Sequence, residues 1–182
     1  MRIVGKLLGI GTAAALATMA ACGSQEPVGT SGAAVVGGAS YTTFDATAQG
    51  CLDSPNGVNC NHYTAKNKVY VNGGPVAGGL TDGSYYFAVL VPGSQNGGFI
   101  DGATGNLSSP FDSSANRTFT VTNHQISAYG GTHAKGTSPN GKLIIDLFPY
   151  ADTTNPGGVY ILAVCQVGAS SPRQCKFDAF KV

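Results

Sequence analysis

Three histidines, His62, His124 and His133, are the residues whose chemistry could serve a hydrolase in this chain. A serine–histidine–aspartate triad is assembled in space, so the distances between residues along the sequence neither predict nor exclude one. Serine and aspartate are plentiful, and each histidine therefore has possible partners. The sequence contains no H-E-x-x-H, G-x-S-x-G or P-loop motif that would single out one set. No catalytic residue is assigned, and a hydrolase is kept only as an alternative.

The acidic residues give little support to other catalytic or metal-dependent chemistry. The sole glutamate is Glu26, so the remainder of the chain lacks the glutamate form of the carboxylate pair that glycosidases use. The segment Asp101-Gly-Ala-Thr-Gly-Asn106 has one carboxylate, whereas Ca²⁺ requires six to eight oxygen ligands. We therefore expect no metal and no cofactor.

Four of the five cysteines are spaced for disulfide bonds. A Pro-Asn-Gly turn signal lies between Cys51 and Cys60, and a segment with glycine and proline lies between Cys165 and Cys175. A turn in each segment brings its two cysteines opposite each other, which predicts the disulfides Cys51–Cys60 and Cys165–Cys175. Four cysteines allow three pairings, and these local ones are favoured. A zinc site is the competing interpretation, but the spacings are not C-x₂-C.

The fifth cysteine, Cys22, ends the run Met19-Ala-Ala-Cys22. That run follows an uncharged stretch that begins at Leu7, after the basic residues Arg2 and Lys6. The arrangement resembles a bacterial lipoprotein signal peptide with its lipobox. The resemblance implies a signal peptide over residues 1–21, cleavage before Cys22, and palmitate-type acylation that inserts Cys22 into membrane lipid. The stretch is too short to span a bilayer comfortably, which agrees with a processed signal. The alternative is an ordinary secretory signal and a secreted protein in which Cys22 is not acylated.

Composition and charge limit the possible partners and the number of domains. Loss of the signal leaves eight basic and nine acidic residues, a formal charge of −1, so nucleic acid is not an expected ligand. Residues 22–39 are rich in small residues and are predicted to form a flexible tether. Residues 40–182 suffice for one core. We expect the protein in the cell envelope. In a Gram-negative bacterium we expect it in the outer membrane, because the residue after Cys22 is glycine and not the aspartate that favours inner-membrane retention in enteric lipoproteins.

The rest of the chain is predicted to be all-β, a single antiparallel two-sheet β-sandwich of immunoglobulin-like or prealbumin-like type. Frequent Asn-Gly and Asp-Gly turns separate short segments rich in β-branched and aromatic residues. The continuous apolar runs are typical of central strands covered on both faces, and the charged last segment is typical of an edge strand. The expected strands are 41–46, 68–71, 84–91, 117–122, 125–129, 142–149, 159–167 and 175–182.

One of these segments, Leu80 to Gly93, resembles the signature strand of Cna-B and SdrD-B type domains of bacterial surface proteins. The resemblance implies a prealbumin-like sandwich that serves in stalks or repeats. Lys–Asn isopeptide chemistry and SdrD-B calcium binding are not carried over, because the glutamate and the aspartate-rich loop are missing. The matching residues are Thr81, Asp82, Gly83, Tyr85, Phe87, Leu90, Pro92 and Gly93.

The segment of residues 93–116, named here the long loop, is the candidate contact region, since loops on a rigid sandwich are free to carry recognition. Its apolar residues show no strand-like alternation, so they either cap the open end of the sandwich or form an exposed patch, and the cap is favoured. Tyr150 is the best candidate for an exposed aromatic side chain. The four apolar residues of the long loop are Phe99, Ile100, Leu107 and Phe111.

These features together favour a membrane-anchored, non-catalytic exported surface module for adhesion, envelope structure or ligand binding. Its partners would be membrane lipid, through acylated Cys22, and a surface or matrix ligand whose identity the sequence does not specify. The alternative function is a small exported hydrolase or a hydrolase inhibitor.

Overall fold

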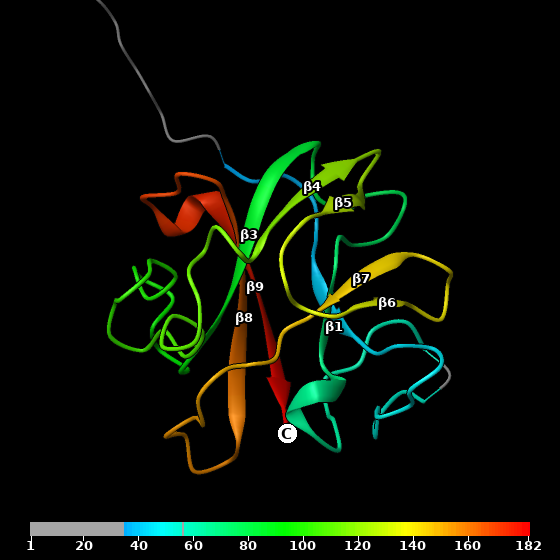
Figure 1. Ribbon diagram of the computed structural model, residues 1–182, viewed down its shortest axis with the longest axis horizontal. Coiled ribbons are helices and arrows are strands. Elements are labelled where there is room, and N and C mark those ends of the chain that lie inside the picture. The colour runs from blue at the N-terminus through cyan, green and yellow to red at the C-terminus, as the bar shows by residue number, and fades with distance from the viewer. Residues whose placement is uncertain (1–34, 56) are drawn as a thin grey trace, which may run out of the picture. The chain divides into compact units, whose positions relative to one another are not determined.

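The computed structural model describes residues 35–55 and 57–182, and Cys22 with the predicted signal peptide lies outside these residues. The described part is an antiparallel two-sheet β-sandwich, which confirms the predicted fold class (Figure 1). Its elements are β1 (Tyr41–Thr43), η1 (Lys66–Lys68), β2 (Tyr70–Asn72), β3 (Gly83–Leu90), β4 (Thr118–Thr122), β5 (Gln125–Tyr129), β6 (Lys135–Thr137), β7 (Leu143–Asp146), β8 (Val159–Gln166), η2 (Pro172–Gln174) and β9 (Cys175–Lys181).

One sheet has the strand order β1-β2-β7-β6 and the other β5-β4-β3-β8-β9. Each of the eight predicted segments overlaps one strand, and the ends agree or differ by up to three residues. Strand β6 was not predicted, and it pairs with β7 through Lys135↔Ile145 and Thr137↔Leu143. Its Lys-Gly-Thr sequence has no apolar residue, so it gives no alternating pattern to detect.

The two longest strands, β3 and β8, lie in the middle of the five-stranded sheet and are covered on both faces, as predicted. Inward side chains such as Phe87 and Val164 join the core between the sheets. Outward side chains such as Leu90 and Ala163 join a second cluster that includes Phe99 of the long loop. The continuous apolar runs therefore reflect two separate cores, one on each face of this sheet.

The packed structure begins earlier than the sequence predicted. Val36 is fully buried, and its backbone N–H donates to the carbonyl of Arg173 at 3.1 Å. Ala39 forms an isolated bridge with Gly79. The sandwich therefore includes residues from Val36 onward, and the predicted boundary between tether and domain at residue 40 is too late.

The last strand, β9, lies at the edge of its sheet, as expected for its charged sequence. Backbone hydrogen bonds from Lys181 to Asn61 and from Tyr63 to Lys181 cover part of this edge. The carboxylate of Asp178 accepts hydrogen bonds from the backbone N–H (2.6 Å) and the hydroxyl (3.1 Å) of Thr42 in β1. The Asp178 side chain on the edge strand thus links the two sheets. Burial raises the pKa of this carboxyl.

Candidate functional site

The long loop is held against the end of β3 by regular hydrogen bonds. The N–H of Leu107 donates to the carbonyl of Val89 at 2.8 Å, and the N–H of Val89 donates to the Ser108 hydroxyl oxygen at 2.9 Å. In Figure 1 the loop forms the green coil at the left of the sandwich. The longest segment without a strand is therefore part of the folded domain.

A buried cluster of ionisable residues holds the long loop in addition to its hydrogen bonds with β3. Arg117, directly before β4, is fully buried and donates from Nη1 to the carbonyl of Phe87 at 2.8 Å. Its Nε lies 2.9 Å from Asp112 Oδ1, and its Nη2 contacts Asp101 Oδ1. The other oxygen of Asp112 lies 2.8 Å from His133 Nε2. Arg117, Asp101, Asp112 and His133 are together named the Arg117 cluster.

Within this cluster, Arg117 and its aspartate partners stabilise each other in the charged state. Burial alone would raise the pKa of Asp101, but the backbone N–H of Ser114 (2.6 Å) and the Arg117 guanidinium more than offset it, so this pKa is lowered. Asp101 is therefore ionised at neutral pH. A buried guanidinium is costly without partners, so Arg117 ties both aspartates of the long loop to the sheet.

The structure divides the four predicted contact residues into two pairs. Phe99 (0 % exposed) and Leu107 (8 %) are buried, whereas Ile100 (46 %) and Phe111 (53 %) are exposed. Phe99 does not cap the open end of the sandwich, as the favoured interpretation supposed, but covers the outer face of the five-stranded sheet. Leu107 belongs to the core between the sheets. Only Ile100 and Phe111 of these four can therefore offer apolar surface to a partner.

A pocket of about 430 Å³ opens beside the loop on the same outer face, and we name it the outer pocket. Tyr86 of β3 and Thr118 of β4 are among its lining residues. Ile100 and Asp101 of the long loop form one wall, and residues 167–169, which follow β8, form a second wall. The pocket is thus bounded by the loop that the Arg117 cluster holds and by the turn that follows β8.

No family model matches the chain, and neither a curated protein nor a solved structure matches it. The resemblance to Cna-B and SdrD-B domains therefore stays a prediction. Within the described residues, no helix has the length and apolar character that a membrane span requires.

His133 comes closest to a catalytic arrangement, because it is paired with an aspartate. Its ring is buried, its Nε2 faces Asp112, and it packs edge-on against Phe87 with the ring centres 5.0 Å apart. The ring lies within the Arg117 cluster and contributes to the bracing of the long loop. Its Nδ1 has no hydrogen-bond partner among the described residues, so the structure places no serine hydroxyl against it.

The other two histidines lie elsewhere. His124 occupies the β4–β5 hairpin with a positive φ of 63°, as its predicted place in a turn requires, and its Nδ1 lies 2.9 Å from the carbonyl oxygen of Leu80. His62 forms a backbone bridge with Lys181 beside β9. The described histidines therefore do not assemble a triad, and each has a place in the architecture instead.

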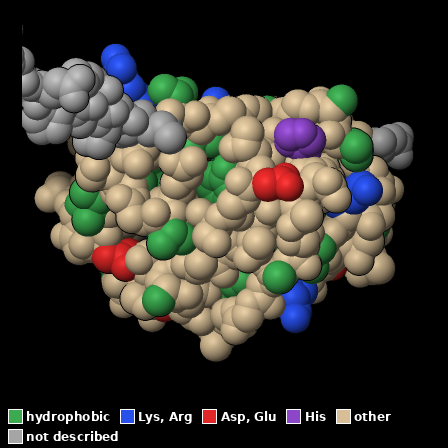
Figure 2. Space-filling view, turned by 90° about the horizontal axis from the view of Figure 1, so that it is seen from above, with side chains coloured by type: hydrophobic (Ala, Val, Ile, Leu, Met, Phe, Trp, Pro, Cys, Tyr) green, Lys and Arg blue, Asp and Glu red, His purple; other side chains and the backbone are tan. Residues whose placement is uncertain are grey.

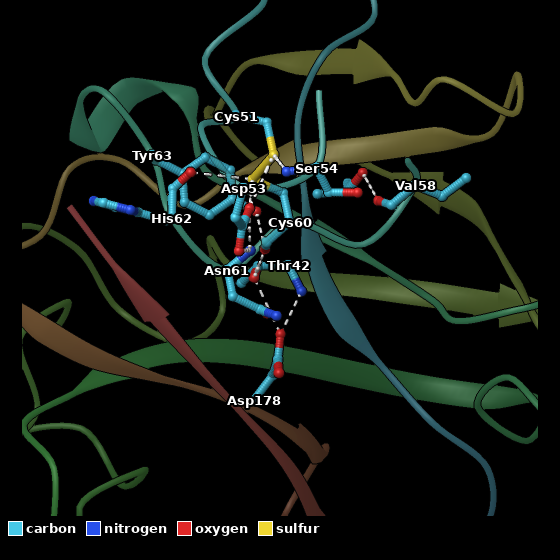
Figure 3. Close-up of a disulfide and its surroundings, with 11 residues drawn as sticks. Thr42, Cys51, Asp53, Ser54, Val58, Cys60, Asn61, His62, Tyr63 and Asp178 are labelled. Atoms are coloured by element: carbon cyan, nitrogen blue, oxygen red, sulfur yellow. Dashed lines mark hydrogen bonds between the residues drawn. A yellow bond between two sulfur atoms is a disulfide. The ribbon is translucent and has the colours of Figure 1, made fainter. Parts of the chain in front are cut away.

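Both predicted disulfides are confirmed. The bonds Cys51–Cys60 and Cys165–Cys175 are formed, and Figure 3 shows the first with its surroundings. Asp53 Oδ1 lies 3.2 Å from each sulfur of the first bond and accepts a hydrogen bond from the N–H of Asn61. This group has the composition of a metal site, but its sulfurs are bonded to each other and provide no thiolate ligand.

Tyr150 is not exposed, so the prediction of an accessible ring at this position is wrong. It is 1 % exposed and packs edge-on against Tyr160 and Phe180. Lys66 donates to the Tyr150 carbonyl at 2.7 Å and lies over its ring. The neighbouring proline and polar loop suggested a surface position, whereas the aromatic partners come from β8 and β9.

Charged side chains are dispersed on one face of the molecule (Figure 2). On the face in Figure 2, Lys and Arg side chains stand singly among uncharged groups. A second hollow, of about 630 Å³, lies between the edge strands β5 and β6, where Asp45 and Lys135 are among its lining residues. Its lining is a nearly even mixture of polar and apolar surface, whereas the lining of the outer pocket is mostly apolar.

Proposed function

We propose that this protein is a membrane-anchored, non-catalytic exported module that binds a surface or matrix ligand through the long loop. The observation that carries the proposal is the combination of a braced loop with exposed apolar side chains. The Arg117 cluster holds the loop, while Ile100 and Phe111 remain accessible on it. A loop already ordered before binding loses little conformational entropy in the complex, which favours recognition.

The arrangement of the histidines favours binding over catalysis. A nucleophilic hydrolase needs its base within hydrogen-bond reach of a nucleophile and open to substrate. His133, which has the aspartate partner, is buried beneath the loop against Phe87. This geometry offers no reason to prefer the alternative hydrolase.

The anchoring part of the proposal rests on the sequence around Cys22, and the two disulfides are consistent with an oxidising compartment. Replacement of Cys22 by Ala in the producing cells should abolish metabolic labelling with palmitate and release the protein from membranes. Unchanged labelling and membrane association would reject the anchor.

The binding part is tested with the mature chain, in which Cys22→Ser keeps the protein in solution. We expect it to be retained on isolated envelope fractions or on immobilised matrix proteins. The double variant Ile100→Ser/Phe111→Ser should lose this retention with little change in melting temperature. A matched variant, Leu52→Ser/Val76→Ser, removes two equally exposed apolar side chains elsewhere and should bind normally. Equal retention of both variants would exclude the loop as the binding surface.

A further inference from the structure

We propose that the outer pocket binds a primary ammonium group on an unbranched alkyl stem, as found on a lysine side chain of a partner. This inference rests on the proposed function and gives the chemistry that the long loop would recognise. It follows from the charge, the walls and the rigidity of the pocket.

The charge of the pocket comes from Asp101. Its carboxylate is one third exposed, and its pKa is lowered as described above, so it stands in the pocket wall as an anion. The single guanidinium of Arg117 is shared between Asp101 and Asp112, so it compensates Asp101 only in part. An ammonium group has three donors and no acceptor, and it would complete the neutralisation of this carboxylate.

The lining of the pocket contains no competing cation. The residues around it include no Lys, Arg or His, because the Arg117 side chain is wholly buried behind Asp101. An anionic ligand would meet the Asp101 carboxylate without a basic partner. Charge complementarity therefore favours a cation.

The walls suit an aliphatic stem. The apolar residues Ile100, Val167, Ala115 and Ala169 are among those that line the pocket. Ile100 and Val167 are 46 % and 56 % exposed, so a ligand would remove their apolar surface from water. A lysine side chain matches this arrangement, because its four methylene groups precede the charged group.

Both walls are fixed before any ligand binds. The Arg117 cluster holds the wall that contains Asp101. The second wall follows β8 directly, and the buried disulfide Cys165–Cys175 joins the end of β8 to the start of β9. A rigid pocket of this kind avoids the cost of ordering side chains on binding.

The probe for this inference is Nα-acetyl-L-lysine N-methylamide, added to the ¹⁵N-labelled mature chain with Cys22→Ser. We expect saturable shifts of the backbone amides of Ala115, Gly168 and Ala169, with a Kd on the order of 1 mM for so small a ligand. The same probe acetylated on Nε, and the corresponding norleucine derivative, lack the ammonium charge and should bind at least about tenfold more weakly.

Two variants test separately the negative charge of Asp101 and the open volume of the outer pocket. Asp101→Asn should weaken binding of the lysine probe at least about tenfold, whereas Asp152→Asn, at a highly exposed carboxylate, should leave it unchanged. Because Asp101 also contacts Arg117, a second variant avoids the cluster. Ala115→Leu, at an exposed position, should fill the pocket and abolish the shifts without unfolding the domain.

Absence of shifts at the pocket amides, or equal binding of the lysine and norleucine probes, would overturn the inference. Binding that survives Ala115→Leu would do the same. The two proposals fail separately: envelope retention that depends on Phe111, without lysine binding, would refute the pocket alone. Lysine binding in the pocket without any envelope or matrix retention would refute the proposed function alone.

Discussion

Arg117 Nε lies 2.9 Å from Asp112 Oδ1, although the Arg117 side chain is entirely buried. Asp112 uses its second oxygen to face His133 Nε2 at 2.8 Å. One carboxylate of the long loop thereby joins the residue directly before β4 to the segment between β5 and β6. The loop is therefore held through side-chain contacts of Asp112 to segments that lie on either side of β5 in the sequence.

The first prediction follows from this pairing. Asp112→Ala leaves the buried guanidinium with Asp101 as its remaining carboxylate partner. It should lower the free energy of unfolding by about 3 kcal/mol or more. Asp152→Ala removes a carboxylate whose side chain is 89 % exposed and should cost about 0.5 kcal/mol or less. Chemical denaturation of both variants measures the difference, and equal losses would show that the cluster does not brace the domain.

The second prediction uses the contrast between two phenylalanines of the same loop. Phe99→Ser removes a fully buried ring from the outer cluster and should destabilise the domain by about 4 kcal/mol. Phe111→Ser affects a ring that is 53 % exposed and should change stability by about 0.5 kcal/mol or less. Thermal unfolding of the two variants tests this, and a large loss for Phe111→Ser would assign that ring to the core as well.

Local sequence patterns predicted the sandwich and its disulfides because each signal acts over a few residues. The alternation in β4, the apolar run of β8 and the turns between paired cysteines are all complete within single segments. The three-residue strand β6 escaped prediction because it lacks apolar residues and depends on pairing with β7.

The Arg117 cluster could not be predicted in the same way. Its members are separated by up to 32 positions (133 − 101) and meet only after the long loop folds over the sheet. Nothing in the neighbours of Asp101 or Asp112 distinguishes them from solvated aspartates. The one available signal was Arg117 itself, a basic residue directly before the alternating segment of β4. The prediction that Tyr150 is exposed was wrong for a related reason, since strands distant in the sequence supply the rings that bury it.

The third prediction concerns the disulfides. Each closes a short loop, with sequence separations of 9 and 10, so each should contribute about 2.7 kcal/mol in the chain-entropy treatment. Cys51→Ala/Cys60→Ala and Cys165→Ala/Cys175→Ala should each lower the unfolding free energy by about this amount in guanidinium denaturation. Non-reducing peptide mapping of the unaltered protein should yield the two local cross-links. A peptide that joins Cys51 to Cys175 would contradict the pairing.

The last prediction is a pH dependence that originates at Asp146 in β7. Burial raises the pKa of Asp146 to about 6, although the N–H of Phe148 donates to Oδ1 at 2.9 Å and the positions of His133 and Lys68 oppose the shift. In the unfolded chain the pKa of this carboxyl is near 3.8, the ordinary value for an aspartate. As the pH rises between these two values, the unfolded chain releases this proton first, so the folded state loses stability. The loss should reach about 2–3 kcal/mol above pH 6.

Asp146→Asn keeps an oxygen that can accept from Phe148 and removes the charge. The difference in unfolding free energy between this variant and the parent should be small at pH 4 and should rise to about 2 kcal/mol in favour of the variant at pH 7. Asp101, whose pKa shift has the opposite sign, and Asp178 are present in both proteins, so their contributions cancel in this difference. Urea denaturation at a series of pH values measures it. A difference that does not change between pH 4 and pH 7 would show that folding does not raise the pKa of Asp146.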